Sequence, residues 1–159
     1  MLYCKTIKDF SDNLPNVGFL LGVDYGQKKV GLSLSDSKQI FAMPHSVIKL
    51  KTIKEISAEI ARLVRDKPLC GIVFGYPLEI SGETGQSCKN VEKFVEDLDL
   101  SKLDTPYYYQ DERFTTKSAS KFLEANIPSK KRRDLVDDDS MAAAYILQTA
   151  LDLLQRCER

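Results

Sequence analysis

The stretch that decides the fold is LGVDYGQKKVGLSLSD, residues 21–36. Apolar residues lead up to Asp24, a Tyr-Gly turn follows, and the second half alternates branched apolar residues with glycine and serine. This period of two is typical of a strand with one covered face. The pattern therefore predicts an antiparallel hairpin of strands over 17–25 and 29–36. It also places a carboxylate at the end of a buried strand, where an unpaired charge costs several kcal/mol unless a partner compensates it.

Changes in hydrophobic period along the rest of the chain extend the hairpin into an α/β pattern. We expect further strands over 40–50, 69–77 and 105–113, and helices over 52–66, 86–100 and 140–159. Pro44 interrupts the first of these strands, which favours a place at the sheet edge. Three antiparallel strands followed by strand–helix units predict a mixed sheet with helices on its faces.

Size and composition indicate one globular domain. The chain has 159 residues, of which 43% are hydrophobic and 29% are charged. Lys and Arg balance Asp and Glu at 23 each, so nucleic-acid binding would depend on local basic patches. No apolar run approaches the roughly 20 residues of a membrane span, and the N-terminus lacks the apolar core of a signal peptide. We expect residues 1–16 to be a loosely docked N-terminal extension and residues 17–159 to form the domain.

Cysteine and histidine usage bears on location and on metal chemistry. The four cysteines are far apart and lack paired metal-ligand spacing, so we interpret them as reduced thiols of a cytoplasmic protein. His45 is the only histidine. A metal site in this chain must therefore be built mainly from oxygen, which favours Mg or Mn.

Three acids stand where the predicted elements end or begin. Asp24 ends the first strand, Glu112 ends the fifth, and Asp139 opens the last helix, one turn before the stripe that packs on the sheet. If the first and fifth strands run parallel, the three carboxylates meet at one edge, where their repulsion calls for divalent cations. Two such cations can activate a water and stabilise the leaving oxygen of a phosphodiester. We therefore predict that this trio is catalytic and binds Mg or Mn.

Each acid also has an ordinary structural role open to it. Asp24 could close the turn that follows it. Glu112 could pair with Arg113 or with a lysine across the strand. Asp139 could cap its helix, in competition with the two aspartates that precede it. The residues alone leave these alternatives open.

The chain resembles the YqgF/RuvX family in four segments that appear in the family's order and spacing: LGVDYGQKKVGLSLSD, GIVFGYPLEISGETG, QDERFTT and DSMAAAYILQ. The resemblance covers residues 18–156. These proteins are RuvC-like, RNase H-fold nucleases, described as Holliday-junction-resolvase-like and as pre-16S rRNA processing nucleases. The resemblance implies an α/β, RNase H-like fold with a mixed five-stranded sheet of order 3-2-1-4-5, strand 2 antiparallel, and helices on both faces. It also places the family's acidic residues on Asp24, Glu112 and Asp139.

Basic and hydroxyl side chains near the acids are the candidates for nucleic-acid binding: Lys28, Lys29, Arg113, Thr115, Thr116, Lys130, Lys131, Arg132 and Arg133. For Arg113 we favour a bidentate contact with a phosphate over an ion pair with Asp111. The alternative for the run over 130–133 is a solvated charged face.

Together these features predict a metal-dependent nuclease that cleaves phosphodiester bonds, with structured RNA favoured over DNA and 5′-end maturation of pre-16S rRNA as the expected reaction. The alternatives are a Holliday-junction-type DNA resolvase and an RNase H-like module that binds nucleic acid without cutting it. A nucleotide phosphotransferase is a further rival, because the hairpin also resembles that of the actin, hsp70 and sugar-kinase superfamily. We expect no membrane partner, and the sequence leaves monomer and homodimer open.

Overall fold

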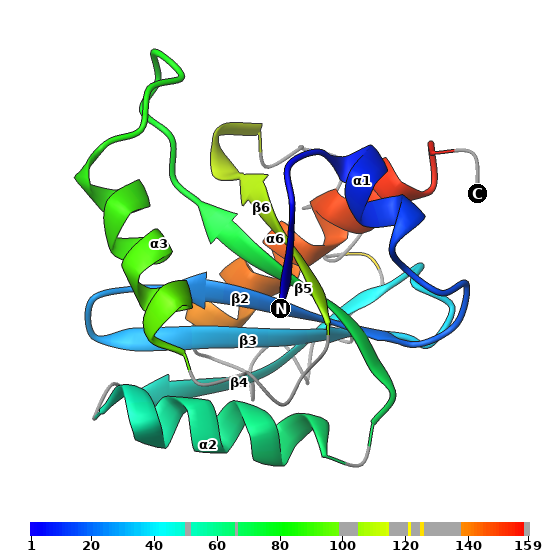
Figure 1. Ribbon diagram of the computed structural model, residues 1–159, viewed down its shortest axis with the longest axis horizontal. Coiled ribbons are helices and arrows are strands. Elements are labelled where there is room, and N and C mark those ends of the chain that lie inside the picture. The colour runs from blue at the N-terminus through cyan, green and yellow to red at the C-terminus, as the bar shows by residue number, and fades with distance from the viewer. Residues whose placement is uncertain are drawn as a thin grey trace.

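A six-stranded mixed sheet organises the computed structural model, which describes residues 1–49, 52–65, 67–98, 105–114, 121, 125 and 138–157. The strands are β1 (Leu2–Cys4), β2 (Phe19–Tyr25), β3 (Lys29–Ser35), β4 (Ala42–Lys49), β5 (Leu69–Tyr76) and β6 (Pro106–Asp111). The helices are α1 (Ile7–Asp12), α2 (Ile53–Val64), α3 (Gln86–Asp97) and α6 (Asp138–Leu154), and a 3-10 turn, η1 (Glu112–Phe114), follows β6 (Figure 1).

The sheet order is β1-β6-β5-β2-β3-β4. β3 runs antiparallel to both of its neighbours, whereas β2, β5, β6 and β1 are mutually parallel. The predicted hairpin is confirmed, with β2 and β3 paired from Leu21↔Leu34 to Tyr25↔Val30. The predicted five-strand order is also confirmed, and β1 adds a sixth strand. Pro44 lies in the edge strand β4 beside a shift in register, where its missing N–H is tolerated.

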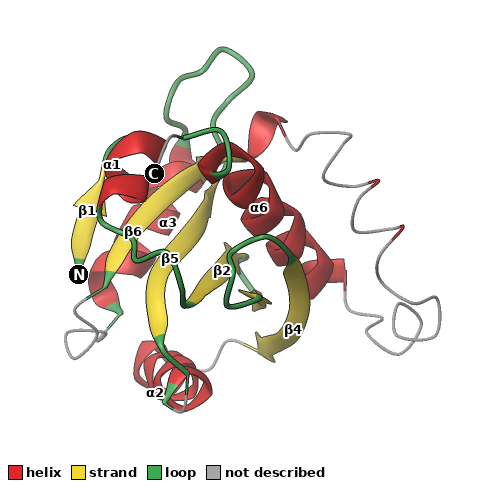
Figure 2. Ribbon diagram, turned by 90° about the vertical axis from the view of Figure 1, so that its right-hand side faces the viewer, coloured by secondary structure: helices red, strands yellow, loops and turns green. Residues whose placement is uncertain are grey.

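Helices cover both faces of the sheet. Leu32 of β3 and Phe74 of β5 belong to a core closed by α2 and α3. On the other face Leu20 and Val73 belong to a core closed by α1 and α6. Figure 2 shows α6 passing β5 and β2 toward β4. The two faces therefore follow from the alternation of side chains along each strand.

The N-terminal segment is part of this sheet and core, so the expectation that it is loosely docked is wrong. β1 pairs in parallel with β6 at the sheet edge. A capping box begins α1, in which the backbone N–H groups of Asp9 and Thr6 donate to each other's side chains. Phe10 is fully buried and stacks on Tyr108 with ring centroids 5.8 Å apart. Residues 1–16 thus share one sheet with the residues that follow.

All four cysteines have free thiols. None of the helices in the described part of the chain combines the length and the apolar character needed to cross a membrane.

We expect Phe10→Ala to lower the free energy of unfolding by about 3–4 kcal/mol, because truncation of a buried phenylalanine removes apolar contacts and leaves a cavity. Val17→Ala is the matched control, since the Val17 side chain is 67% exposed, and it should change stability by less than about 0.5 kcal/mol. Urea denaturation followed by circular dichroism measures both variants. A loss below about 1 kcal/mol for Phe10→Ala would show that α1 lies outside the cooperative fold.

Candidate active site

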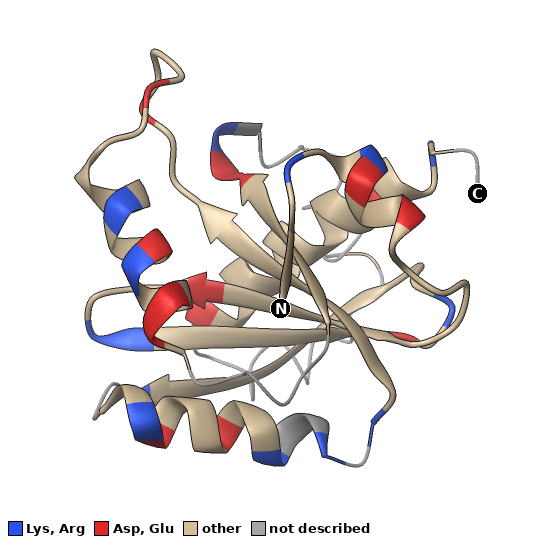
Figure 3. Cartoon of the chain, in the orientation of Figure 1, with Lys and Arg blue, Asp and Glu red and all other residues tan. Residues whose placement is uncertain are grey.

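The site lies where β2 and β6 end and α6 begins. Asp24 is the last but one residue of β2, on the face that α6 covers, and its partner on β3 is Gly31. The next residue, Tyr25, faces the other side of the sheet and stacks on Phe94 of α3, with ring centroids 4.4 Å apart. This stacking holds the strand end from the opposite face, so Asp24 lies on the face of the sheet that α6 covers. In Figure 3 red segments, which mark Asp and Glu, lie at the ends of β2 and β6.

A glycine on β3 brings Asp139 next to Asp24. A Cβ at Gly31 would collide with the backbone carbonyl group of Asp139, so only glycine lets the start of α6 lie this close to the sheet. One turn further along, the Ser33 hydroxyl donates a 2.8 Å hydrogen bond to the carbonyl oxygen of Ala143. The small residues that alternate along β3 therefore fix both the distance of α6 from the sheet and its position along β3.

A second glycine makes room for Glu112. β6 ends at Asp111, two residues before the end of the predicted strand over 105–113, and Glu112 opens the turn η1. A Cβ at Gly75 of β5 would collide with the Oε1 atom of Glu112. The Glu112 carboxylate thus lies across β5 on the α6 face, which is the face that carries Asp24.

The three acids perturb one another in pairs. Burial, followed by the charge of Asp139, raises the pKa of Asp24 to about 6. Burial, followed by the charges of Asp24 and Asp111, raises the pKa of Glu112 to about 7. Asp24 therefore lies between the other two members of the trio. Carboxylates crowded in this way are frequent at functional sites.

A lysine approaches the trio from the hairpin turn. The Nζ atom of Lys29 lies 3.0 Å from the Oδ2 atom of Asp139. Both side chains are partly open to solvent, at 41% and 40% exposure. Lys28, the neighbouring candidate, is exposed at the same turn. The structure thus brings Lys29 to Asp139, one of the three predicted acids.

The donor set fits a hard divalent cation in its chemistry, since the side chains that meet at this edge are carboxylates. Among the residues that the structure describes, no three His, Cys, Asp or Glu side chains are already gathered closely enough to hold an ion. Asp24, Glu112 and Asp139 would hold such an ion after side-chain adjustment, and the Asp139 carboxylate would exchange its contact with Lys29.

A cleft of about 230 Å³ opens beside two of the acids. Its lining comes from the end of β2, the following turn, Pro77, the first turns of α3 and η1: Asp24, Tyr25, Gly26, Gln27, Pro77, Ser87, Asn90 and Glu112. Ser87 and Asn90 were not predicted. Their spacing relative to the buried Phe94 places them at the edge of the buried stripe of α3, and this was the signal available in the sequence.

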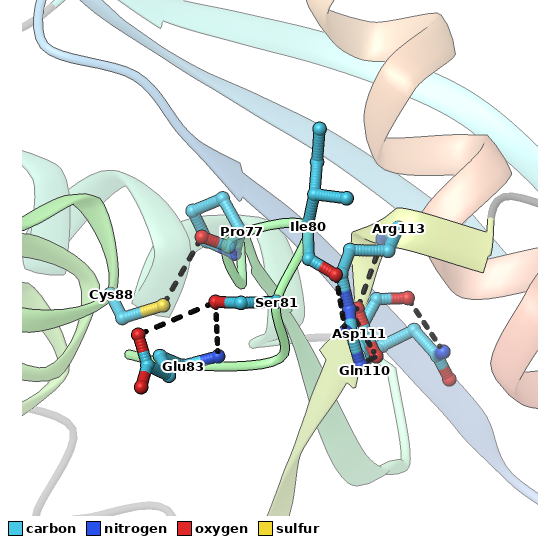
Figure 4. A network of polar contacts seen from close by, with 8 residues as sticks. All are labelled: Pro77, Ile80, Ser81, Glu83, Cys88, Gln110, Asp111 and Arg113. Carbon is cyan, nitrogen blue, oxygen red and sulfur yellow. Dashed lines mark hydrogen bonds and ion pairs between the residues drawn. The ribbon is translucent and has the colours of Figure 1, made fainter. Parts of the chain in front are cut away.

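Arg113 binds Asp111, the alternative to the phosphate contact that we favoured. Its Nε atom lies 3.1 Å from both carboxylate oxygens and its Nη2 atom lies 2.8 Å from Oδ2 (Figure 4). These bonds hold the pKa of Asp111 below its usual range. Its Nη1 atom also reaches the carbonyl oxygen of Ile80, in the loop after β5. In this structure the guanidinium therefore ties that loop to the end of β6.

The remaining candidates for nucleic-acid binding lie outside the described residues. They are Thr115, Thr116, Lys130, Lys131, Arg132 and Arg133. Of the predicted site residues that the structure describes, it brings together Asp24, Glu112, Asp139 and Lys29.

Comparison with known proteins assigns the family. A family model described as "RuvX: Holliday junction resolvase" matches residues 18–153. The chain belongs to the RuvX family. Relatives that carry the name "Putative pre-16S rRNA nuclease" include one from Anaplasma marginale (strain St. Maries), 37% identical over 96% of each chain. Another, from Rickettsia bellii (strain OSU 85-389), is 38% identical over 90% of this chain and 91% of the relative.

Solved structures support the RNase H-like fold of this RuvX chain. RuvC of T. thermophilus in complex with a Holliday junction substrate aligns with a TM-score of 0.57 at 12% identity, covering 85% of this chain and 94% of RuvC. The fowlpox virus Holliday junction resolvase aligns with a TM-score of 0.50 at 13% identity, covering 87% of this chain and 99% of the resolvase. At these identities the likeness shows the fold alone.

The raised pKa values predict that the metal-free protein loses stability as the pH rises. Folded Asp24 and Glu112 keep protons that the unfolded chain has released, so the free energy of unfolding falls between about pH 4 and about pH 7. We expect a fall on the order of 1–2 kcal/mol, because partial exposure screens both groups. Asp24→Asn should remove about half of it, since this change deletes one acid and its charge on Glu112, whereas the burial that contributes most to the Glu112 shift stays. Urea denaturation in EDTA across this range measures the effect.

The comparison with Asp24→Asn is needed because His45 titrates in an overlapping pH range and changes the free energy of unfolding in the opposite direction. Burial, followed by the charges of Lys67 and Arg62, lowers its pKa. Wild type and Asp24→Asn share this histidine, so the difference between their profiles isolates the acids. Asp12→Asn, on the exposed side of α1, is the control and should keep the wild-type profile. Parallel profiles for wild type and Asp24→Asn would contradict the crowding at the site.

Proposed function

We propose that this RuvX chain is a divalent-metal-dependent nuclease that hydrolyses phosphodiester bonds in structured RNA, with the 5′ end of pre-16S rRNA as its substrate. The observation that carries the proposal is the meeting of three carboxylates, from β2, η1 and α6, on one face of the sheet. Their mutual perturbation is the expected state of a site whose natural counter-charge is a cation. A nucleic-acid-binding module without catalysis gains nothing from such acids beside phosphates.

The chain's own residues have distinct tasks in this proposal. Asp24, fixed between the two other acids, orients the reaction centre, and Glu112 and Asp139 supply carboxylate oxygens from either side. A bound Mg or Mn supplies activation of the attacking water and stabilisation of the leaving oxygen. Ser87 and Asn90 offer polar groups in the adjoining cleft, and the exposed Lys28 lies at the hairpin turn where backbone phosphates can meet it.

The names of the relatives support RNA as the substrate. Relatives at 37% and 38% identity, aligned over nearly the whole chain, carry a name that specifies pre-16S rRNA. A DNA resolvase is the second candidate, because the family model carries that description. We place the protein in the cytoplasm, and monomer and homodimer are both compatible with the RNA reaction.

We expect Asp24→Asn and Glu112→Gln each to lower the rate of RNA cleavage by about a thousandfold, because each removes a carboxylate from the reaction centre. EDTA should abolish cleavage and Mg or Mn should restore it. Asp12→Asn is the matched control and should cleave at the wild-type rate. Cleavage is measured with a 5′-labelled RNA that spans the 5′ end of the 16S sequence. Unchanged cleavage by Asp24→Asn would assign the activity to another site or another protein.

A four-way DNA junction, assayed beside the RNA, separates the candidate functions. Faster cleavage of RNA supports the proposal, whereas symmetrical cleavage of the junction favours the resolvase. RNA binding that persists in EDTA, together with no cleavage product in Mg or in Mn, identifies the non-catalytic module.

A further inference from the structure

The ion pair between Lys29 and Asp139 gives the site a property beyond its set of acids. Lys29 is the first residue of β3, and it shares a face of that strand with Gly31 and Ser33. This is the face on which α6 lies, and Gly31 is the residue that holds the backbone of Asp139 against the sheet. The 3.0 Å contact is therefore set by the same packing that places Asp139 beside Asp24.

We infer that Lys29 is a built-in counter-ion that binds Asp139 in the metal-free protein and is displaced from it when a divalent cation enters the site. The inference rests on the proposed function, because the displacing cation is the proposed Mg or Mn. Lys29 and the cation compete for one carboxylate. The released ammonium group is then available to a phosphate of the RNA.

The exposure of the pair makes this exchange easy. Both side chains are about two-fifths exposed, and ion pairs of that kind are weak because water competes for each partner. A lysine side chain is a flexible stem of four carbons, so rotation about its bonds can move the ammonium group away from Asp139 while the backbone of β3 stays in place. The Asp139 backbone cannot move in the same way, since it lies against Gly31. Exchange therefore requires a movement of Lys29 and no movement of α6.

The acids explain why a counter-ion is needed before metal binds. Asp24 lies between Glu112 and Asp139, and each of its two neighbours is another carboxylate. An ammonium group on Asp139 reduces the repulsion at one side of this row. On the other side Asp111, which also acts on Glu112, is bound by Arg113. Lys29 and Arg113 thus form ion pairs with the two outer acids, Asp139 and Asp111.

Mn²⁺ affinity, measured by electron paramagnetic resonance of free Mn²⁺, tests the competition without any need for activity. We expect Lys29→Met to bind Mn²⁺ about two- to fivefold more tightly than wild type, and Lys29→Arg, which keeps the charge, to match wild type. Lys28→Met is the matched control for a general effect of charge, and it should change the affinity by less than about 1.5-fold because its side chain points into solvent at the same turn. In an Asp139→Asn background Lys29→Met should have no effect.

Three results would overturn the inference: unchanged or weaker Mn²⁺ binding by Lys29→Met, an equal gain in Lys28→Met, or a gain that persists in the Asp139→Asn background. Thermal unfolding in EDTA confirms that the variants are folded. Tighter Mn²⁺ binding by Lys29→Met in a protein that cleaves no RNA would uphold the competition and reject the nuclease. If Asp24→Asn abolishes RNA cleavage but Lys29→Met leaves the Mn²⁺ affinity unchanged, the nuclease is upheld and the competition is rejected. In an active enzyme, Lys29→Met should raise the KM for RNA severalfold and leave kcat within about twofold.

Discussion

The close approach of α6 to the sheet is the constraint on which the site depends. The backbone of Asp139 touches β3 because residue 31 has no side chain, and Ser33 fixes the helix one turn later by a hydrogen bond to Ala143. Glycine inside a strand is unfavourable for the strand itself. The cost is offset by the fully buried stripe on α6, which includes Leu147, Ala150, Leu151 and Leu154. Packing on one face of β3 therefore decides where a carboxylate lies at the end of β2.

The electrostatics of the site oppose the packing that creates it. Placing Asp24 and Glu112 against α6 removes water from both, which raises both pKa values. The charge of Asp139 adds to the shift of Asp24, and the charge of Asp24 adds to that of Glu112. A fold optimised for stability alone would separate them or pair each with a base. Instead Lys29 and Arg113 form ion pairs with Asp139 and Asp111, the acids that flank Asp24 and Glu112. The local conflict between charge and burial is the kind that folds retain at functional sites.

The sequence predicted those features that have a periodic or positional signal. Alternation predicted the hairpin, Pro44 predicted the edge strand, and helical spacing predicted that the start of α6 lies against the sheet. The N-terminal segment escaped prediction because a three-residue strand and a six-residue helix are too short to show a period. Their stability comes from tertiary burial of Phe10, which sequence reasoning could not locate.

Side-chain partners were the other limit of prediction. Lys28 and Lys29 are adjacent residues of the same type, and only the register of β3 distinguishes the lysine that reaches Asp139. The partner of Arg113 depended on whether a guanidinium two residues from Asp111 could fold back onto it. The 3-10 turn at the end of β6 brings the two close enough for it to do so. Both choices are set by backbone geometry over two or three residues, which amino-acid pattern does not encode.

The Asp-Glu-Arg segment at residues 111–113 acts as one structural unit. Asp111 holds Arg113, and Arg113 reaches the carbonyl oxygen of Ile80 in the loop that leads from β5 to α3. Glu112, between them, turns to the opposite face and lies over Gly75, at the base of the same loop. The loop and the acid are thus supported by the two sides of one short turn. Because Gly75 gives Glu112 its space and Arg113 supports the loop, the end of β6 positions Glu112 and the loop that carries Pro77, and both residues line the cleft.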